Sequence, residues 1–169
     1  MTIRAHHLNT QFSFLLESSP GFGSEAEQMR ERVESAIATR IMTGARLEAS
    51  QQLRFAFEDA DRNGWDGDGS VAMSAQAFGT GSTFLASLPF YVPSPSIAPG
   101  GDGSVAMEWD GPRGRWLTAM LDADGTLSMA WNRRGERGHA WTRFDGAIPD
   151  ELLHQLRRTI DLAGVSGSC

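Results

Sequence analysis

The spacing of apolar side chains changes near residue 102. Upstream, apolar residues recur about every fourth position, whereas downstream four short segments alternate apolar and polar residues at every second position. These segments are 104–109, 115–121, 126–131 and 138–144, and glycine occurs in each of the three connections between them. Alternation with period two is typical of strands, and short strands joined by tight turns pair antiparallel. The sequence therefore predicts a four-stranded antiparallel β-meander.

A C-terminal helix is predicted after the meander. Ile148, Leu152, Leu156 and Ile160 recur every fourth residue, and Pro149 suits the first turn of a helix. One apolar stripe of this kind is expected to pack across the apolar face of the sheet.

Helices are also predicted before the meander. Ser24 and Glu27 have the spacing of a capping box, and Gly44 is expected to separate a first helix from a second over 46–60, as in an αα-hairpin. The stripe of the first helix recurs every fourth residue: Met29, Val33, Ile37 and Ile41. The second helix has a less regular apolar face: Leu47, Leu53, Phe55 and Phe57.

A third helix is predicted over 75–87, with Ser74 as its N-cap and Pro89 after its end. Two internal glycines would either permit close packing against the sheet or mark a kink: Gly79 and Gly81. Residues 89–100 are rich in proline, which indicates a connection, with an edge strand near Ile97 as an option.

These elements define an α+β fold: N-terminal helices, then a helix, the four-stranded meander and a C-terminal helix packed on the sheet. We expect a helical N-terminal region over 1–62 and a helix–meander–helix core over 63–169, joined in one compact domain. The pattern assigns no structure to residues 1–23.

Charge and composition limit the classes of function. The net charge is −6, and residues 1–110 hold 14 acidic residues and 7 arginines. An acidic chain without lysine is a poor candidate for nucleic-acid binding, and it excludes Schiff-base and P-loop chemistry. It is compatible with docking on a basic protein partner by electrostatic complementarity. No apolar run is long enough to span a bilayer, no signal core follows the N-terminus, and Cys169 is the single cysteine. We therefore expect a cytoplasmic protein without disulfide, structural zinc or cofactor.

The Asp-rich stretch 59–70 is the strongest candidate for a site. Asp59, Asp61 and Asn63 have the spacing of the first calcium ligands in an EF-hand loop, but Ser70 replaces the bidentate glutamate at the last position. A capped, turn-rich loop is the simpler interpretation, and a weak calcium site is the alternative.

The residues predicted to bind a protein partner come from this loop and from a later turn. Trp65, Asp66 and Asp68 belong to the loop, where Trp65 could either anchor an interface or fill the edge of the core. Arg133 and Arg134 lie in the turn 132–138 and could contact phosphate or an acidic protein, or could keep a hairpin tip soluble. The outer face of the sheet is expected to contribute as well.

Catalysis is the less favoured hypothesis. The chain has no nucleophile elbow and no dinucleotide fingerprint. A small enzyme would need a dispersed site built from Asp66, Asp68, His139 and His154. The predicted function is instead a non-enzymatic protein-binding module, of the kind found among inhibitors, antitoxins, immunity proteins and anti-defence factors.

One heptapeptide, Gly-Asp-Gly-Ser-Val-Ala-Met, occurs at both 67–73 and 101–107. The flanks of the two copies differ, and we interpret the repeat as the same turn chemistry used twice.

Three motifs in order resemble a family of small bacterial proteins of unknown function. They are Trp-Asp-Gly-x-Gly-Ser at 65–70, Phe-Leu-x-x-Leu-Pro at 84–89 and Asp-Gly-Ser-Val-x-Met-Glu-Trp at 102–109. The resemblance covers about residues 63–160. It implies the helix–meander–helix arrangement and carries over no catalytic residue.

Overall fold

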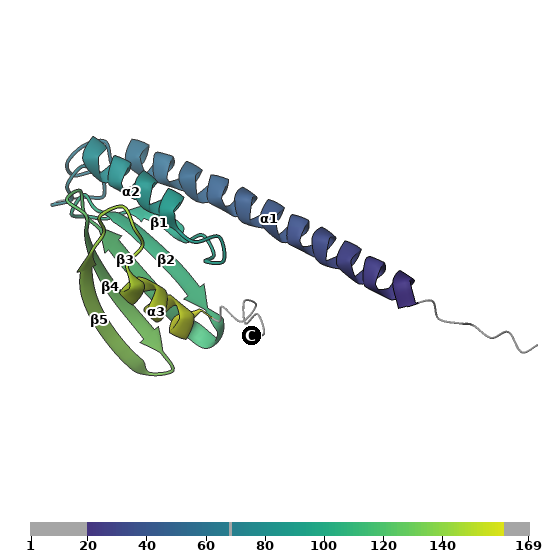
Figure 1. Ribbon diagram of the computed structural model, residues 1–169. Helices are drawn as coiled ribbons and strands as arrows, with labels where there is room; N and C mark the ends of the chain where they lie inside the picture. The colour runs from purple at the N-terminus through teal and green to yellow at the C-terminus, as the bar shows by residue number, and fades with distance from the viewer. Residues whose placement is uncertain (1–19, 68, 161–169) are drawn as a thin grey trace, which may run out of the picture. The chain divides into compact units, whose positions relative to one another are not determined.

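The computed structural model describes residues 20–67 and 69–160. The chain divides into two compact units, Met1–Ala36 and Ile37–Cys169. The elements in chain order are α1 (Pro20–Asp59), α2 (Ala75–Ser87), β1 (Ser96–Pro99), β2 (Val105–Gly111), the short 3₁₀ helix η1 (Pro112–Gly114), β3 (Arg115–Leu121), β4 (Thr126–Arg133), β5 (Glu136–Arg143) and α3 (Asp150–Thr159). Figure 1 shows these elements.

The fold is α+β, as predicted, but the meander has five strands and not four. All neighbours pair antiparallel in the order β1-β2-β3-β4-β5. The additional strand is β1, in which Ile97 pairs with Met107. Its four residues are too few to show alternation, and prolines occur at its end and just before it, so the pattern there indicates mainly a connection.

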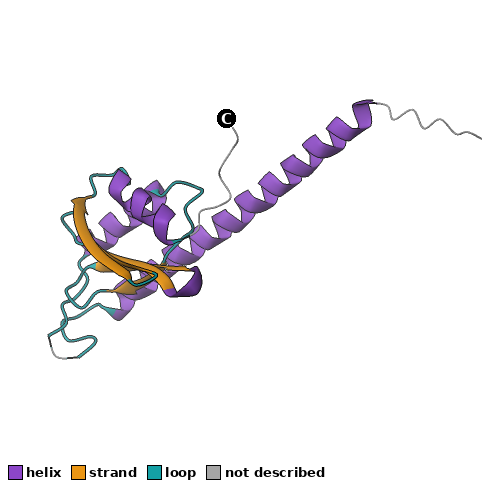
Figure 2. Ribbon diagram, turned by 90° about the horizontal axis from the view of Figure 1, so that it is seen from below, coloured by secondary structure: helices purple, strands orange, loops and turns teal. Residues whose placement is uncertain are grey.

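Alternation divides the sheet into a buried face and an open face. The register aligns Met107, Ala119 and Met129 across β2, β3 and β4, and all three are buried. α2 and α3 contact this face, and both helices lie on one side of the strands (Figure 2). The other apolar side chains on this face complete the core: Val105, Trp109, Leu117, Leu121 and Leu127.

α1 is one continuous helix, which corrects the predicted αα-hairpin. Gly44 lies within it and has no atom near the position of an added Cβ. A glycine inside a helix lowers its stability by about 1 kcal/mol relative to alanine. This cost alone does not end a helix, and α1 continues through Gly44 to Asp59. The expected apolar faces also differ, because Met29, Val33, Leu47 and Phe55 are exposed. Of the predicted face, Leu53 is buried and Phe57 packs against the core. The other buried residues are Ala49 and Ala56, followed by Ala60 just after the helix.

α2 has the predicted bounds and the predicted cap. The Ser74 hydroxyl accepts a hydrogen bond from the Ala77 amide at 3.0 Å. Of the two glycines, Gly81 is buried, and a Cβ there would lie 3.1 Å from Val105 and 3.4 Å from Leu53. Gly81 thus allows α2 to approach both β2 and α1, which favours close packing over a kink.

Arg46 of α1 holds the end of α2. Its guanidinium donates to the carbonyl oxygens of Leu85 at 2.8 Å and Leu88 at 2.9 Å, and to those of Pro89 at 2.6 Å and Val92 at 3.3 Å. The last carbonyls of a helix have no partner within the helix and carry partial negative charge, so one cation satisfies several of them. Burial lowers the pKa of Arg46 from its ordinary value.

α3 packs on the sheet as its stripe predicts. Leu152, Leu156 and Ile160 are buried, and Ile148 packs against the same core. The first turn holds Asp150 and Glu151 and the last turn holds two arginines, which matches the helix dipole at both ends.

Candidate binding surfaces

The Asp-rich loop is closed by its own hydrogen bonds. The Gly64 amide donates to the Ser70 carbonyl at 2.8 Å, and the Asp66 amide donates to the Ser70 hydroxyl at 3.1 Å. Asp66 is exposed, so its carboxylate faces solvent. Asp68 lies outside the described residues. The loop therefore presents Asp66 on a hydrogen-bonded turn.

Trp65 is half-buried and packs against the core. Its indole Nε1 donates to the Val71 carbonyl at 3.2 Å. A Trp that uses both its ring and its N–H within its own domain braces the loop. This placement favours the core-edge interpretation over the interface anchor.

The three residues of the alternative calcium site lie at the end of α1 and in the loop that follows it. Asp59 ends α1, while the Asp61 carboxylate lies 3.5 Å from the Arg62 guanidinium. The Asn63 amide oxygen accepts from the Ala72 amide at 2.9 Å and so braces the loop. Within residues 20–67 and 69–160, no group of three or more His, Cys, Asp or Glu residues could hold a metal ion.

The two heptapeptide copies meet in space. The Val71 amide of the first copy donates to the Gly101 carbonyl of the second at 2.8 Å. Gly103 has a φ of +84°, and a Cβ there would lie 2.9 Å from the Ala72 carbonyl oxygen. Gly69, the matching position, also has positive φ. At Gly103, only glycine suits both the left-handed backbone and this close approach.

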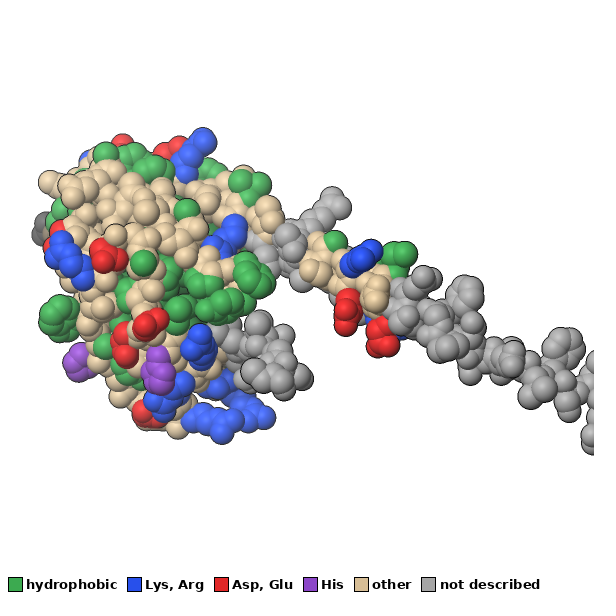
Figure 3. Space-filling view, viewed as in Figure 1, with side chains coloured by type: hydrophobic (Ala, Val, Ile, Leu, Met, Phe, Trp, Pro, Cys, Tyr) green, Lys and Arg blue, Asp and Glu red, His purple; other side chains and the backbone are tan. Residues whose placement is uncertain are grey.

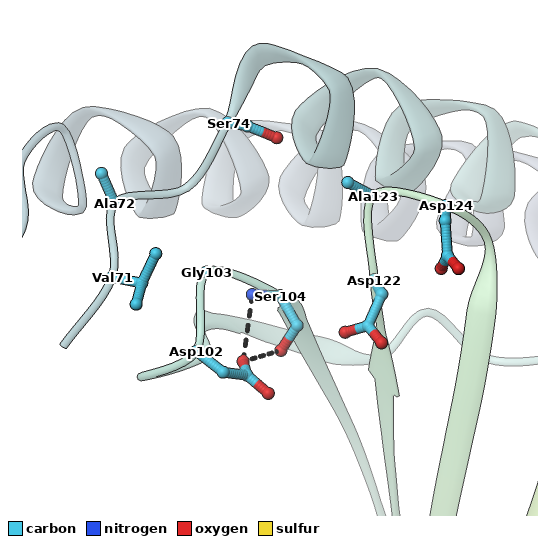
Figure 4. A pocket seen from close by; sticks show the side chains of 9 residues that line it. All are labelled: Val71, Ala72, Ser74, Asp102, Gly103, Ser104, Asp122, Ala123 and Asp124. Atoms are coloured by element: carbon cyan, nitrogen blue, oxygen red, sulfur yellow. Dashed lines mark hydrogen bonds between the residues drawn. The ribbon is translucent and has the colours of Figure 1, made fainter. Parts of the chain in front are cut away.

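An open cleft of about 370 Å³ lies where the copies meet. Its walls are formed by three residues before α2, by the turn at 102–104 and by the β3–β4 turn at 122–124 (Figure 4). The three residues before α2 are Val71, Ala72 and Ser74. Figure 4 shows three carboxylates around it, those of Asp102, Asp122 and Asp124.

Each carboxylate of the cleft titrates differently. The Asp102 carboxylate accepts hydrogen bonds from the Ser104 hydroxyl at 2.6 Å and from the Ser104 amide at 3.1 Å, and these bonds lower the pKa of Asp102. The Thr126 amide, 2.9 Å away, lowers the pKa of Asp124. Burial, and then the charges of Asp102 and Asp124, raise the pKa of Asp122. Asp122 is therefore the carboxylate that is least stabilised in its charged form.

We expect Asp122→Asn to stabilise the fold at neutral pH by at most about 0.5 kcal/mol, because it removes a partly buried charge and its repulsion by Asp102 and Asp124, both weakened by solvent. A raised folded pKa means that protonation favours folding. The gain should therefore be present at pH 7, shrink as the pH falls through the folded pKa of Asp122, and vanish below the unfolded value. Urea unfolding at several pH values measures it, and high salt should reduce it. A gain that is the same at low pH would contradict this assignment.

Arg133 lies in the interior and not in an exposed turn. β4 continues to Arg133 and β5 begins at Glu136, so the turn is shorter than the predicted 132–138. The Arg133 Nε donates to the Thr159 hydroxyl at 3.1 Å, and the guanidinium also bonds the Gln155 side chain of α3. Burial, then the charge of Arg158, lowers the pKa of Arg133.

Arg133 is also part of a stack on the inner sheet face. Its guanidinium carbon lies 4.9 Å from the centre of the Trp131 ring. The Trp131 ring also lies so close to Gly138 that a Cβ atom at this position would collide with the ring. Trp131 thus fills the space above Gly138, the residue that it pairs with across the strands. Arg133 joins α3 to the sheet, whereas Arg134, with a φ of +49°, is exposed at the turn.

The open face of the sheet carries aromatic side chains that belong to none of the predicted site residues. Trp141 of β5 is 77% exposed. It pairs across the sheet with Ser128, which pairs with Met120. Trp116 lies on the same face of β3 and is half-buried. Small side chains on β4 therefore separate Trp141 from the apolar residues of β3.

The residues of the alternative enzyme site are dispersed. His139 lies on the open face of β5, whereas His154 is exposed on α3, which covers the opposite face. Asp66 lies in the loop before α2. The sheet thus separates the two histidines.

No family model, curated protein or solved structure matches this chain. The family resemblance of the three motifs stays a prediction. Among the residues whose placement is described, none of the helices combines the length and apolar character needed to cross a bilayer.

Proposed function

We propose that the chain is a non-enzymatic protein-binding module that contacts its partner through the open face of the sheet. The exposure of Trp141 carries this proposal. The tryptophan extends from a regular strand, and 77% of its surface is exposed. Trp and Arg are enriched among residues that dominate binding energy, and Arg137 and Arg143 lie on the same face on either side of Trp141.

The surroundings of Trp141 support the same proposal. Its neighbours across the sheet, Ser128 and Met120, make a surface without long charged side chains. Such a surface with a charged rim has the anatomy of a transient interface. A module of this kind acts by occupying its partner's surface, as inhibitors, antitoxins, immunity proteins and anti-defence factors do.

Affinity capture from a lysate of the native host tests the proposal. The full chain and its Trp141→Ser variant are immobilised, and retained proteins are compared by mass spectrometry. We expect retention of a specific partner to fall about tenfold or more in the variant, because losing a central Trp costs at least about 2 kcal/mol.

Phe90→Ser is the matched control, since Phe90 is also 77% exposed but lies between α2 and β1. It should retain the partner. If both variants retain the same proteins as the unchanged chain, the open face is not the binding surface.

A further inference from the structure

The two edges of the sheet are protected to different degrees. At one edge, β1 has four residues and ends at Pro99, and the Ile97 amide donates to the Gln52 side chain of α1 at 2.8 Å. Shortness, proline and an occupied amide are all devices that prevent another strand from pairing. The β1 edge is therefore blocked.

At the other edge, β5 lacks those devices. It has eight residues, contains no proline, and has none of its residues buried. Among the described residues, β4 is the only strand that pairs with it. Its outer row of backbone amides and carbonyls can therefore accept another strand.

The side chains of β5 indicate the charge of such a strand. On the open face, in order, lie Arg137, His139, Trp141 and Arg143. Arg143 also donates to the Asp124 carbonyl at 2.9 Å, and its charge helps to lower the pKa of the Asp124 carboxylate. The one acidic residue, Glu136, lies on the other face and pairs with Arg158 at 3.8 Å. The face that a new strand would extend is thus basic at both ends, with Trp141 between.

The surface around one end of the sheet is also positively charged. Figure 3 shows basic side chains gathered at the end of the sheet that carries the β2–β3 and β4–β5 turns. Arg113 and Arg134 are exposed in these two turns. This local charge opposes the acidic character of the whole chain, and it would attract an acidic segment.

We propose, resting on the protein-binding function above, that β5 binds an extended acidic segment of a partner protein as a sixth strand of the sheet. Backbone hydrogen bonds supply affinity, and side chains at alternate positions supply specificity. Acidic residues of the segment lie opposite Arg137 and Arg143, and apolar residues lie opposite His139 and Trp141.

Charge disfavours a second copy of the chain as the occupant. If β5 paired with its own copy in full antiparallel register about Ala140, Arg137 would lie opposite Arg143 twice. Like charges directly opposite each other destabilise a strand pair. An acidic partner meets no such repulsion.

A synthetic peptide tests this pairing directly. The probe is Glu-Thr-Val-Thr-Val-Thr-Glu with blocked ends, which presents the same face in either strand direction. Two control peptides are used. The same peptide with Lys in place of Glu tests the contribution of charge, and the Glu peptide with N-methylated backbone amides tests the contribution of backbone hydrogen bonds. Binding to the full chain is followed by fluorescence anisotropy. We expect the Glu peptide to bind with a Kd below about 1 mM and both controls to bind at least about tenfold more weakly.

Charge reversal in the protein completes the test. The double variant Arg137→Glu, Arg143→Glu should bind the Glu peptide with about tenfold lower affinity than the unchanged chain does, and should bind the Lys peptide more tightly than the Glu peptide. The matched control Arg54→Glu, Arg62→Glu reverses two exposed arginines away from the sheet and should bind as the unchanged chain does. Circular dichroism confirms folding of each variant.

The outcomes separate this inference from the proposed function. No binding of the Glu peptide at about 1 mM, or equal binding of the N-methylated or Lys peptide, overturns strand addition. The capture experiment with Trp141→Ser and Phe90→Ser can still succeed in that case, and the open face then binds a partner without extending the sheet. If capture fails while the peptides behave as expected, strand addition stands and the proposed role of the open face falls.

Discussion

Replacing Arg133 with alanine should destabilise the protein by about 3 kcal/mol. The substitution leaves a cavity beside Trp131 and removes one hydrogen-bond partner each from Gln155 and Thr159, and the cavity and the lost bonds each cost about 1–3 kcal/mol. Urea unfolding measures the change. Arg137→Ala, at an exposed arginine four residues along the chain, serves as the control and should stay within about 0.5 kcal/mol.

Arg133→Met separates packing from charge. Methionine fills much of the same volume, and it removes a buried cation whose Nη1 has no partner among the described residues. Replacement of buried charges by apolar groups of similar volume is often neutral or stabilising, so we expect a change within about 1 kcal/mol. A methionine variant as unstable as the alanine variant would show that the hydrogen bonds to α3, and not the filling of space, hold Arg133 in place.

Arg46→Ala is the second change with a large expected effect, a loss of about 2–4 kcal/mol in the free energy of unfolding. The guanidinium bonds four carbonyl oxygens at and after the end of α2, and hydrogen bonds to a charged group each contribute about 1.5–3 kcal/mol. The expected loss is smaller than their sum because water reaches some of these carbonyls once the side chain is removed.

Two variants give this prediction its controls. Arg46→Lys should recover part of the loss, since an ammonium keeps the charge but cannot reach four acceptors with planar geometry. Arg54→Ala removes an exposed arginine paired with Glu58 and should cost about 0.5 kcal/mol or less. Equal unfolding free energies for Arg46→Ala and Arg54→Ala would contradict the role of Arg46.

The meander and its closing helix could be predicted from the sequence because each depends on local spacing. β3 and α2 have the bounds that their patterns predict. Local spacing could not show that Phe144 is buried while Trp141 is exposed, because both are simply apolar residues in one segment. Residues three apart in a strand face opposite sides, so only the register with β4 decides between them.

The corrections share one physical cause, which is contact between residues distant in sequence. Gly44 alone predicts a break, but packing of the later turns on α2 through Leu53 favours a continuous helix. The glycine-flanked segment around Arg133 predicts an exposed turn, yet the interior position of this arginine depends on Gln155 and Thr159 in α3. Among the candidate sites, the open face is expected from the sequence, but its exposed tryptophan could be placed only with the strands paired.

The two copies of Gly-Asp-Gly-Ser-Val-Ala-Met have an implication for how this chain encodes its conformation. Residues 105–107 begin a strand, while 71–73 belong to no helix or strand and lead into a helix. The same sequence thus has two different backbone conformations within one molecule, although Met73 and Met107 are both buried. The residues downstream of each copy agree with its conformation: Ser74 caps a helix, whereas Trp109 lies within a strand. The same seven residues are thus compatible with two backbones, and the flanking residues differ in the structure that they favour.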